Sequence, residues 1–449
     1  MVEDVESKVK TAKKAAIGLA SVSSDVKDLA LENMALAMDS QRRLILEANA
    51  ADILDAQELC EKGELSRALV DRLKVDDNKI NGMITSIRDV IKLDDPVGRT
   101  LQALELNRGL NLYQVSWPIG LIGVIFESRP DVVPQIMSLC LKSGNSTIFK
   151  GGSESMRSNR VIFDVLVEAI ERIEGIPEGA FQLMETREEV MDILKMDNYI
   201  DLLIPRGSNA FVKFIQDNTR IPVLGHADGI CHAYVDNMAD LTKAYDVCFD
   251  SKVQYPAVCN AIETLLVHQD IVETFLPEMA QRYLDAGVEL RCDERSHEIV
   301  KGIKALKAVF RATEEDWSTE YNDLILSVKV VDSIDDAIDH INSYGSHHTD
   351  AIVTENATSR KLFVNLVDSS SVMVNASTRF ADGFRYGKGA EVGISTNKIH
   401  ARGPVGLEGL VIYKYVLIGN GDVVADYAGS NAKEFTHKKL DMEYTDVKS

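Results

Sequence analysis

The chain has 449 residues, of which 70 are acidic and 49 basic, so its formal net charge is -21. A charge of this sign repels nucleic-acid phosphates and anionic lipid surfaces, and we therefore expect neither a nucleic-acid partner nor a membrane partner. The length predicts two or three domains, and the composition, 45% hydrophobic and 27% charged, is typical of globular proteins. An anionic substrate stays compatible, because a local pocket of Arg and Lys dominates within about 8 Å in physiological salt.

The N-terminal stretch MVEDVESKVKTAKKAA lacks the apolar core of a signal peptide. No segment approaches the ~20 consecutive apolar residues of a membrane span. The six cysteines form neither a C-x-x-C pair nor a Cys/His cluster at zinc spacing. We therefore expect a cytoplasmic protein with reduced thiols and no bound metal.

Residues 1–95 carry apolar side chains three and four positions apart, which predicts a helical lead-in. Short apolar runs then alternate with helical stretches such as NRVIFDVLVEAIERIEG. Strands that are apolar on both faces and separated by helices predict a parallel sheet covered on both sides. Such doubly wound sheets bind nucleotides at the carboxyl ends of their strands. The runs predicted as strands are GLIGVIFE, NSTIFKGG, FQLMET, IDLLIPRG and IPVLGH.

After HADGIC the alternation resumes, which predicts a second α/β domain with strands at CHAYVD, ETLLVH, VELRCD, LILSVKVV, HTDAIVTE and SSVMVNA. Two distant segments, RGLNLYQVSW and LEGLVIYKYVLIGNGD, alternate in polarity and are rich in β-forming residues. We expect these two ribbons to pair into an arm that joins subunits.

One cysteine lies in a setting that suggests chemistry. In SKVQYPAVCNAIETLLVH, Cys259 follows Pro256 and begins CNAIE, which we interpret as a helical turn whose N–H groups would stabilise a thiolate. Free cysteine is also among the most buried residue types. Position alone therefore leaves both a nucleophile and a structural cysteine open.

No G-x-G-x-x-G fingerprint is present, so any phosphate-binding loop is of a less common kind. IPRGSNAF places Gly207 and Ser208 between a strand and a helix, where N–H donors suit a phosphate. IFKGGSES places Lys150 at a strand end before two glycines, which suits an adenosine ribose or its phosphate. For the loop at Lys150 a solvated turn is the alternative, and IPRGSNAF on its own is a weak signal.

The stretch NASTRFADGFRYGKGAEVGISTNKIHARGP, residues 375–404, has little periodicity, and long loops of this kind are more often functional than structural. His340 and His348 lie near a predicted helix end, where packing and substrate contact are both open interpretations. Three acidic residues are candidate general bases, although no partner selects among them: Glu127, Asp228 and Glu391.

Together these stretches resemble one family, the gamma-glutamyl phosphate reductases of the aldehyde dehydrogenase superfamily, over nearly the whole chain. The resemblance rests on GVIFESRPDV, CLKSGNSTIFKGG, DLLIPRGS, VLGHADGICHAYVD, YPAVCNAIETLLVH, VDSIDDAIDHINSYGSHHTDAI and NASTRFADGFRYGKGAEVGISTNKIHARGPVGLEGL. It implies an α/β, aldehyde dehydrogenase-like fold with three parts. These are a Rossmann-type cofactor domain (1–107 and 118–228), a catalytic domain (229–403), and a β oligomerisation arm (108–117 and 404–449).

The resemblance implies that Cys259 is the nucleophile. Its thiolate would attack the acyl phosphate of L-glutamate 5-phosphate, release phosphate, and form a thioester that NADPH reduces to L-glutamate 5-semialdehyde. This is the second step of proline biosynthesis from glutamate, and the product cyclises to 1-pyrroline-5-carboxylate. The implied partners are a separate glutamate 5-kinase, because the chain has no room for a fused one, and further copies of the same chain.

The family also implies roles for other residues. Lys150 resembles the residue near the adenosine ribose, where a cation suits the 2′-phosphate of NADPH, and Glu391 the one that holds the nicotinamide ribose; Gly207 and Ser208 join them as cofactor ligands. For the substrate's phosphate and α-carboxylate we assign three arginines, because guanidinium groups bind both anions in a bidentate manner, together with Asn375. The arginines are Arg129, Arg379 and Arg402.

Two departures separate this chain from the aldehyde-oxidising relatives. GHADGICH lacks their E-L-G-G glutamate, which activates water, and a reductase gains from lacking that base. Ser128 replaces their oxyanion-hole asparagine, so the Cys259 N–H is one expected donor and the second is unassigned. Two rival functions fit the same residues, namely an enzyme of this mechanism acting on another acyl phosphate or a CoA ester, and a silent scaffold protein.

Overall fold

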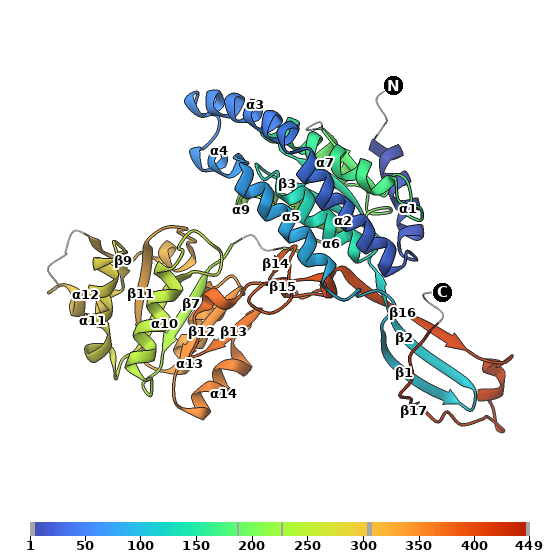
Figure 1. Cartoon of the computed structure of the whole chain (residues 1–449). Helices are drawn as coiled ribbons and strands as arrows, with labels where there is room; N and C mark the ends of the chain where they lie inside the picture. The colour runs from blue at the N-terminus through green and yellow to red at the C-terminus, as the bar shows by residue number, and fades with distance from the viewer. Residues whose placement is uncertain (1–4, 186–187, 226–227, 303–307, 446–449) are drawn as a thin grey trace. The chain divides into compact units, whose positions relative to one another are not determined.

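The computed structural model describes residues 5–185, 188–225, 228–302 and 308–445. The chain forms two compact units, shown in Figure 1: residues 1–224, 388–392 and 405–449 make the first, and residues 225–387 and 393–404 the second. Helices fill the N-terminal part of the first unit, as the apolar periodicity predicts. They are α1 (Val5–Leu19), α2 (Ser24–Ser40), α3 (Arg42–Glu61), α4 (Arg67–Leu73) and α5 (Asp77–Ile91).

A four-stranded parallel sheet with the order β5-β4-β3-β6 forms the centre of the first unit. Its strands are β3 (Leu121–Phe126), β4 (Ser146–Gly151), β5 (Phe181–Met184) and β6 (Leu202–Arg206), linked by α6 (Val132–Lys142), α7 (Met156–Glu171) and α8 (Glu188–Ile193) and followed by α9 (Asn209–Asp217). The order reverses between β3 and β6, and such a switch point opens a crevice at the carboxyl ends of the strands.

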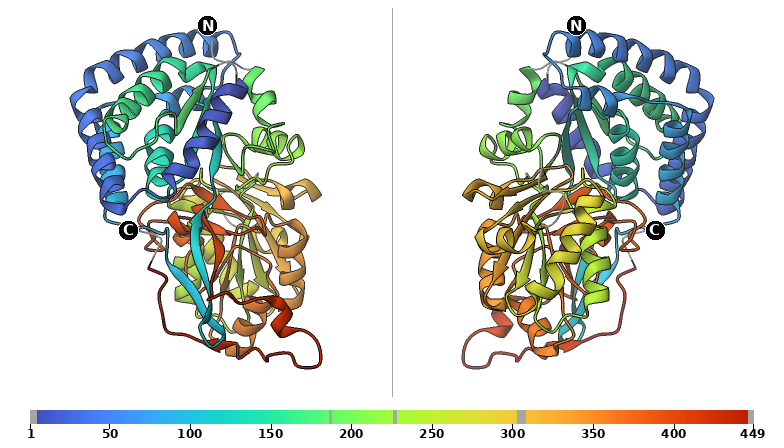
Figure 2. Two further views of the ribbon diagram at one scale, coloured as in Figure 1. Left: turned by 90° about the vertical axis from the view of Figure 1, so that its right-hand side faces the viewer. Right: turned by 90° about the vertical axis from the view of Figure 1, so that its left-hand side faces the viewer.

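Helices cover both faces of this sheet (Figure 2). Apolar residues of α1, α8 and α9 pack in one cluster with β3, β4, β5 and β6, while α6 and α7 pack on the sheet and carry α2 and α5 outside them. The predicted strand IPVLGH forms only an isolated bridge between Leu203 and Val223, because Pro222 has no N–H to give a ladder, and its His226 lies outside the described residues. In the described part of the chain, no helix is long and apolar enough to cross a membrane.

The second unit contains a seven-stranded parallel sheet with the order β10-β9-β11-β8-β7-β12-β13. Side chains of β7 alternate, so that Cys231, Ala233 and Val235 pack with α10 and α11 while Tyr234 packs with α13 and α14. The strands are β7 (Cys231–Val235), β8 (Ile262–His268), β9 (Glu289–Cys292), β10 (Val309–Arg311), β11 (Ile325–Val331), β12 (Thr349–Val353) and β13 (Ser371–Val374). The helices are α10 (Leu241–Val253), α11 (Val272–Asp285), α12 (Glu294–Val300), α13 (Ile334–Tyr344) and α14 (Ala357–Leu366), and a two-stranded sheet joins β14 (Gly393–Ser395) to β15 (Gly403–Val405).

An antiparallel sheet with the order β16-β2-β1-β17 forms an arm of the first unit. It consists of β1 (Thr100–Asn107), β2 (Leu110–Pro118), β16 (Val411–Ile418) and β17 (Lys438–Lys439). The two ribbons pair along β2 and β16, but the predicted arm, 108–117 and 404–449, omits β1. Gly109 (φ +82°) closes a tight hairpin that joins β1 to β2, so β1 belongs to the arm and not to the cofactor domain.

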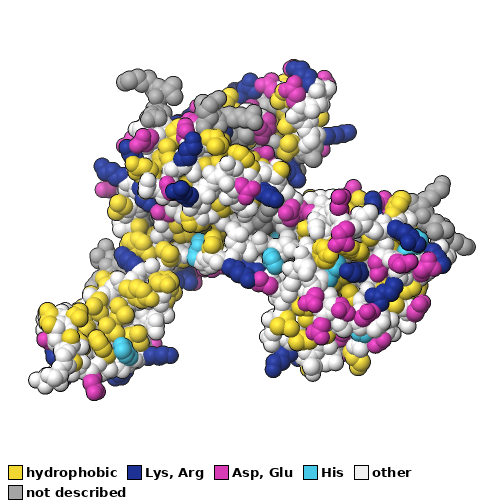
Figure 3. All heavy atoms as spheres, turned by 180° about the vertical axis from the view of Figure 1, so that it is seen from behind, with side chains coloured by type: hydrophobic (Ala, Val, Ile, Leu, Met, Phe, Trp, Pro, Cys, Tyr) yellow, Lys and Arg dark blue, Asp and Glu magenta, His cyan; other side chains and the backbone are white. Residues whose placement is uncertain are grey.

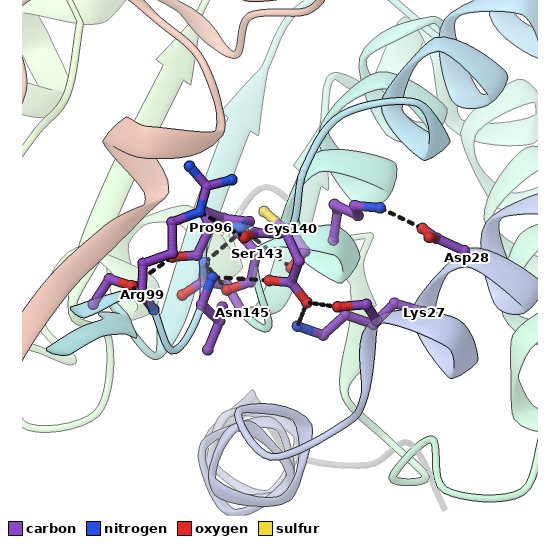
Figure 4. Close-up of polar contacts among 12 residues, drawn as sticks. Lys27, Asp28, Pro96, Arg99, Cys140, Ser143 and Asn145 are labelled. Carbon is purple, nitrogen blue, oxygen red and sulfur yellow. Dashed lines mark hydrogen bonds and ion pairs between the residues drawn. The ribbon is translucent and has the colours of Figure 1, made fainter. Parts of the chain in front are cut away.

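The base of this arm is tied to the helices by buried polar groups, shown in Figure 4. Lys27 Nζ lies 3.1 Å from Asp95 Oδ2, and their side chains are 0% and 4% exposed. The Asp95 carboxylate also accepts bonds from Ser24 Oγ (2.8 Å) and the Val97 N–H (2.8 Å). Asn145 contributes a second tie, because its amide donates to Leu410 O and accepts from the Gly120 N–H. These bonds fix where the arm leaves the unit.

We predict that Lys27→Met lowers the free energy of unfolding of the first unit by about 3–5 kcal/mol, because it leaves the Asp95 carboxylate buried without its cation. Urea unfolding followed by Trp117 fluorescence, with Trp317→Phe as the background, measures this unit. The control is Arg43→Met, which breaks an ion pair whose side chains are 91% and 61% exposed and should change the value by less than about 0.5 kcal/mol. Equal effects of the two changes would contradict a structural role for the buried pair.

Candidate active site

Cys259 lies in a turn between α10 and β8. The Ala261 N–H donates to Val258 O (2.9 Å), which closes one turn, and the chain then enters β8 at Ile262. The expected helix start at CNAIE is therefore wrong, because the apolar residues that follow are buried in a central strand of the parallel sheet. The thiolate cannot depend on a helix dipole here.

Cys259 is one of two accessible thiols. All six cysteines are free, and only Cys60 and Cys259 are partly exposed. Burial raises the pKa of Cys140, Cys248 and Cys292 to about 12. These buried thiols are unsuited to act as nucleophiles at neutral pH, whereas Cys259 stands where a reagent can reach it.

Residues at the start of β7 pack against the main chain of Cys259. A Cβ at Gly229 would lie 2.4 Å from Cys259 O and 2.5 Å from its Cα, closer than real contacts allow. The Cys231 thiol, which is fully buried, donates to Cys259 O (3.1 Å). His348 Nδ1 lies 3.7 Å from that thiol, so His348 is part of the buried packing around Cys231. Close approach of two backbones explains why glycine stands at position 229.

A buried ion pair joins the two ends of the segment that carries Cys259. Lys252 at the end of α10 donates to Glu263 at the start of β8 (2.6 Å), and the side chains are 0% and 1% exposed. Burial raises the pKa of the Glu263 carboxyl to about 7 and lowers that of Lys252, although each partner opposes these shifts. This ion pair therefore holds the two ends of the 254–261 loop together.

Arg379, a predicted substrate ligand, contacts this loop within the second unit. Its Nε donates to Gln254 Oε1 (3.0 Å), while Asn260 Nδ2, next to Cys259, donates to Ala381 O (2.8 Å). Burial and nearby Arg385 lower the pKa of Arg379, and Asp250 and Cys259 act against this. Arg379 is therefore a cation within electrostatic range of the Cys259 thiol.

Asn375 and Arg402 are already engaged elsewhere. Asn375 follows β13, and its amide bonds both main-chain groups of Thr354 beyond the end of β12, at the carboxyl edge of the sheet. Cys259 precedes β8 and so lies at the amino edge of the same parallel sheet. Arg402 pairs with Asp368 (3.2 Å) and donates to its carbonyl. Neither residue is free for the substrate in this arrangement.

His340 is a packed residue on α13. Its ring lies against Trp317, His232 and Tyr344, and Lys329 Nζ is 3.1 Å from Nδ1. Burial lowers its pKa to about 2, so it stays neutral. The packing interpretation thus fits the observed position of His340.

The first unit carries the predicted cofactor residues at the carboxyl edge of its sheet. Lys150 is the second-last residue of β4; it donates to Gly151 O, and burial lowers its pKa. The Ser208 N–H at the start of α9 donates to Glu127 Oε2 (2.7 Å). A Cβ at Gly207 would lie only 2.4 Å from the same oxygen. A cofactor phosphate at this helix end would therefore have to replace a carboxylate.

The other residues near this edge are also placed. Glu154 Oε1 accepts bonds from both the N–H (2.6 Å) and the hydroxyl (2.8 Å) of Ser128, whose φ is +39°. Both donors of Ser128 are thus used, and the second oxyanion donor is not found there. Glu391 lies in residues 388–392, which belong to the first unit and not to the predicted catalytic domain. Its carbonyl accepts from Gln135 Nε2 (3.1 Å), and Arg129 lies 3.7 Å from Asp131.

These features fit a nucleotide cofactor. The edge combines a four-stranded parallel sheet, a switch point between β3 and β6, a lysine near the end of β4, and glycines against which side-chain carboxylates approach the backbone closely. The second unit combines an accessible thiol with a nearby guanidinium.

The chain belongs to the aldehyde dehydrogenase family, whose model matches residues 1–297. An acetylating aldehyde dehydrogenase from Geobacillus thermoglucosidasius shares the fold at 17% identity (TM-score 0.62, covering 93% of this chain and 97% of that one). Within the family, the chain belongs with the gamma-glutamyl phosphate reductases. It is 72% identical over 447 residues to the one from Methanococcoides burtonii, covering 100% of this chain and 99% of the relative.

A crystal structure of gamma-glutamyl phosphate reductase from Thermotoga maritima has a TM-score of 0.89 at 41% identity, covering 94% of this chain and all of that one. The resemblance inferred from the motifs and the predicted fold class are both confirmed.

We predict that Gly229→Ala lowers kcat by about 100-fold, since the added methyl must push the Cys259 turn by about 1 Å. The melting temperature should change little if the turn yields and the sheet does not. Gly302→Ala, at a glycine with no atom within 4 Å of the new Cβ, is the matched control. An unchanged kcat in Gly229→Ala would show that the packing of Gly229 against the Cys259 main chain does not set the position of Cys259.

Proposed function

We propose that this chain reduces L-glutamate 5-phosphate (gamma-glutamyl phosphate) to L-glutamate 5-semialdehyde with NADPH, releasing phosphate, as the second step of proline biosynthesis. The observation that carries the proposal is the accessible thiol of Cys259, whose main chain packs against the start of β7, in a chain 72% identical over its full length to a gamma-glutamyl phosphate reductase. The semialdehyde then cyclises to 1-pyrroline-5-carboxylate.

The Cys259 thiolate attacks the carbonyl carbon of the acyl phosphate. The carbon–oxygen bond to phosphate breaks, phosphate leaves with the electron pair, and a thioester remains. The Cys259 N–H stabilises the oxyanion that forms during attack. The cofactor, when bound, supplies the hydride that reduces the thioester carbon, and loss of the thiolate releases the aldehyde.

The residues at the carboxyl edge of the first unit would hold the cofactor. Lys150 suits the adenosine ribose and its 2′-phosphate, and Glu391 suits the nicotinamide ribose. Gly207 and Ser208 offer main-chain donors once Glu127 is displaced. The sequence from Gly225 to Gly229 contains no glutamate, which protects the thioester from water; His226 and Ala227 lie outside the described residues.

The decisive experiment is the reverse reaction, in which glutamate-5-semialdehyde reduces NADP and phosphate is required. We expect an absorbance increase at the NADPH band that depends on phosphate and is lost in Cys259→Ala, because only the thiolate can form the thioester that phosphate cleaves. Turnover without phosphate would instead mean that water resolves the intermediate. Turnover with CoA in place of phosphate would identify the rival CoA-ester enzyme.

The chain forms homo-oligomers through the arm in this proposal. β16 is an edge strand, and large apolar side chains on it are about half exposed, including Ile412, Tyr415 and Leu417; Figure 3 shows hydrophobic side chains gathered over the arm. An open apolar edge strand is a surface that another strand covers. The six free cysteines support a cytoplasmic location, and a separate glutamate 5-kinase would supply the acyl phosphate.

We predict that Tyr415→Lys combined with Leu417→Lys lowers the oligomeric state, because charge at an edge strand disfavours pairing. Sedimentation of the full chain measures the mass. Val364→Lys on α14, which is also about half exposed, should leave the mass unchanged. A double variant that keeps the wild-type mass would place the subunit interface elsewhere.

A further inference from the structure

Arg379 has an environment that its charge does not explain. The residue is 7% exposed, and within the described residues its one side-chain hydrogen bond is to the neutral Gln254 amide, with no carboxylate paired to the guanidinium. A charge this deeply buried is normally paired, because desolvation is costly. Among the described residues the guanidinium therefore has no direct ion-pair partner, and Asp250 and Asp382 act on it only at longer range.

A second arginine contacts the main chain of this residue. Arg385 Nη1 donates to the main-chain carbonyl of Arg379 (3.0 Å) and also forms a long ion pair with Asp382 (3.8 Å), in which the side chains are 40% and 35% exposed. Burial first, and the like charge of Arg385 second, lower the pKa of Arg379. Bringing two cations together is favourable only when an anion lies between them.

The segment that carries both arginines is fixed against the segment that carries Cys259. Ser251 Oγ bonds Ser377 Oγ (3.1 Å) and the Thr378 N–H (3.2 Å). Asn260, the residue after the nucleophile, bonds Ala381 O. The positive charges are thus held at a set place relative to the thiol by bonds on both sides of it.

We infer that Arg379 and Arg385 together bind the phosphate of the acyl phosphate, and that Arg385 is a specificity-determining residue for phosphate. This inference rests on the proposed function and names the ligand of that site. The phosphate is bonded to the carbon that Cys259 attacks, whereas several carbons separate the α-carboxylate from it. Two guanidinium groups match the near-dianionic charge of a phosphate monoester and bind its oxygens in a bidentate manner.

The first test needs no substrate. The rate of Cys259 alkylation by iodoacetate, an anion, is divided by the rate with neutral iodoacetamide, both measured by mass spectrometry of the Cys259 peptide. Cys60, the other accessible thiol, gives the internal reference. We expect a wild-type ratio above that of Cys60, and a fall of at least about threefold in Arg385→Gln.

Inorganic phosphate separates the ligand classes. It should protect Cys259 from iodoacetate in the wild type and in Arg360→Gln, an exposed arginine on α14 that serves as the control, but not in Arg385→Gln. Protection by L-glutamate without protection by phosphate would overturn the assignment in favour of the α-carboxylate. An unchanged alkylation ratio in both Arg385→Gln and Arg379→Gln would overturn the proposal that these two arginines form an anion site.

The second test uses turnover in the reverse direction. In Arg385→Gln we expect the KM for phosphate to rise about tenfold while the KM for the semialdehyde stays within twofold, because one charge-assisted contact to phosphate is lost. Because the Arg385 side chain is 40% exposed whereas Arg379 is buried, this variant should fold even if Arg379→Gln does not. Wild-type protein without phosphate-dependent turnover would refute the proposed function. The alkylation ratio would still show whether Arg379 and Arg385 bind an anion near Cys259.

Discussion

The main chain of Cys259 and the start of β7 approach each other so closely that no side chain fits between them. Gly229 permits this approach, and the Cys231 thiol separately donates a hydrogen bond to Cys259 O. The buried Lys252–Glu263 pair joins the two ends of the segment that carries Cys259. A nucleophile at position 259, as proposed, would need a fixed attack geometry, and burial of its neighbours supplies one. The remaining features of the second unit are arranged around this turn.

The cofactor edge of the first unit follows a different logic. Two carboxylates, Glu127 and Glu154, occupy the backbone donors that a phosphate or an oxyanion would otherwise use. A helix N-terminus attracts negative charge of any origin, so an internal carboxylate and a cofactor phosphate compete for it. A phosphate can bind there only if it displaces the internal carboxylate. A glycine-loop motif alone therefore does not identify a phosphate site.

The sequence predicted most elements of both sheets, because their strands are apolar on both faces and alternate with amphipathic helices. It failed at specific places. CNAIE looked helical, but its residues lead into a buried strand. β1 was assigned to the wrong part, since pairing across the Arg108-Gly109 hairpin is visible only in three dimensions. Asn375 lies in a loop predicted to be functional, yet parallel strand direction places it at the opposite edge from Cys259.

The sequence by itself determined the class of chemistry, because the family motifs, including the one that carries Cys259, are properties of residue order. Tertiary structure alone decided which charges remain unpaired. Arg402 and Arg379 look alike in the sequence, but Asp368 pairs with the first, whereas the second is buried beside Arg385 with no carboxylate partner among the described residues. Whether a charge is neutralised depends on distances of a few ångströms between segments far apart in the chain, and local sequence does not encode those distances.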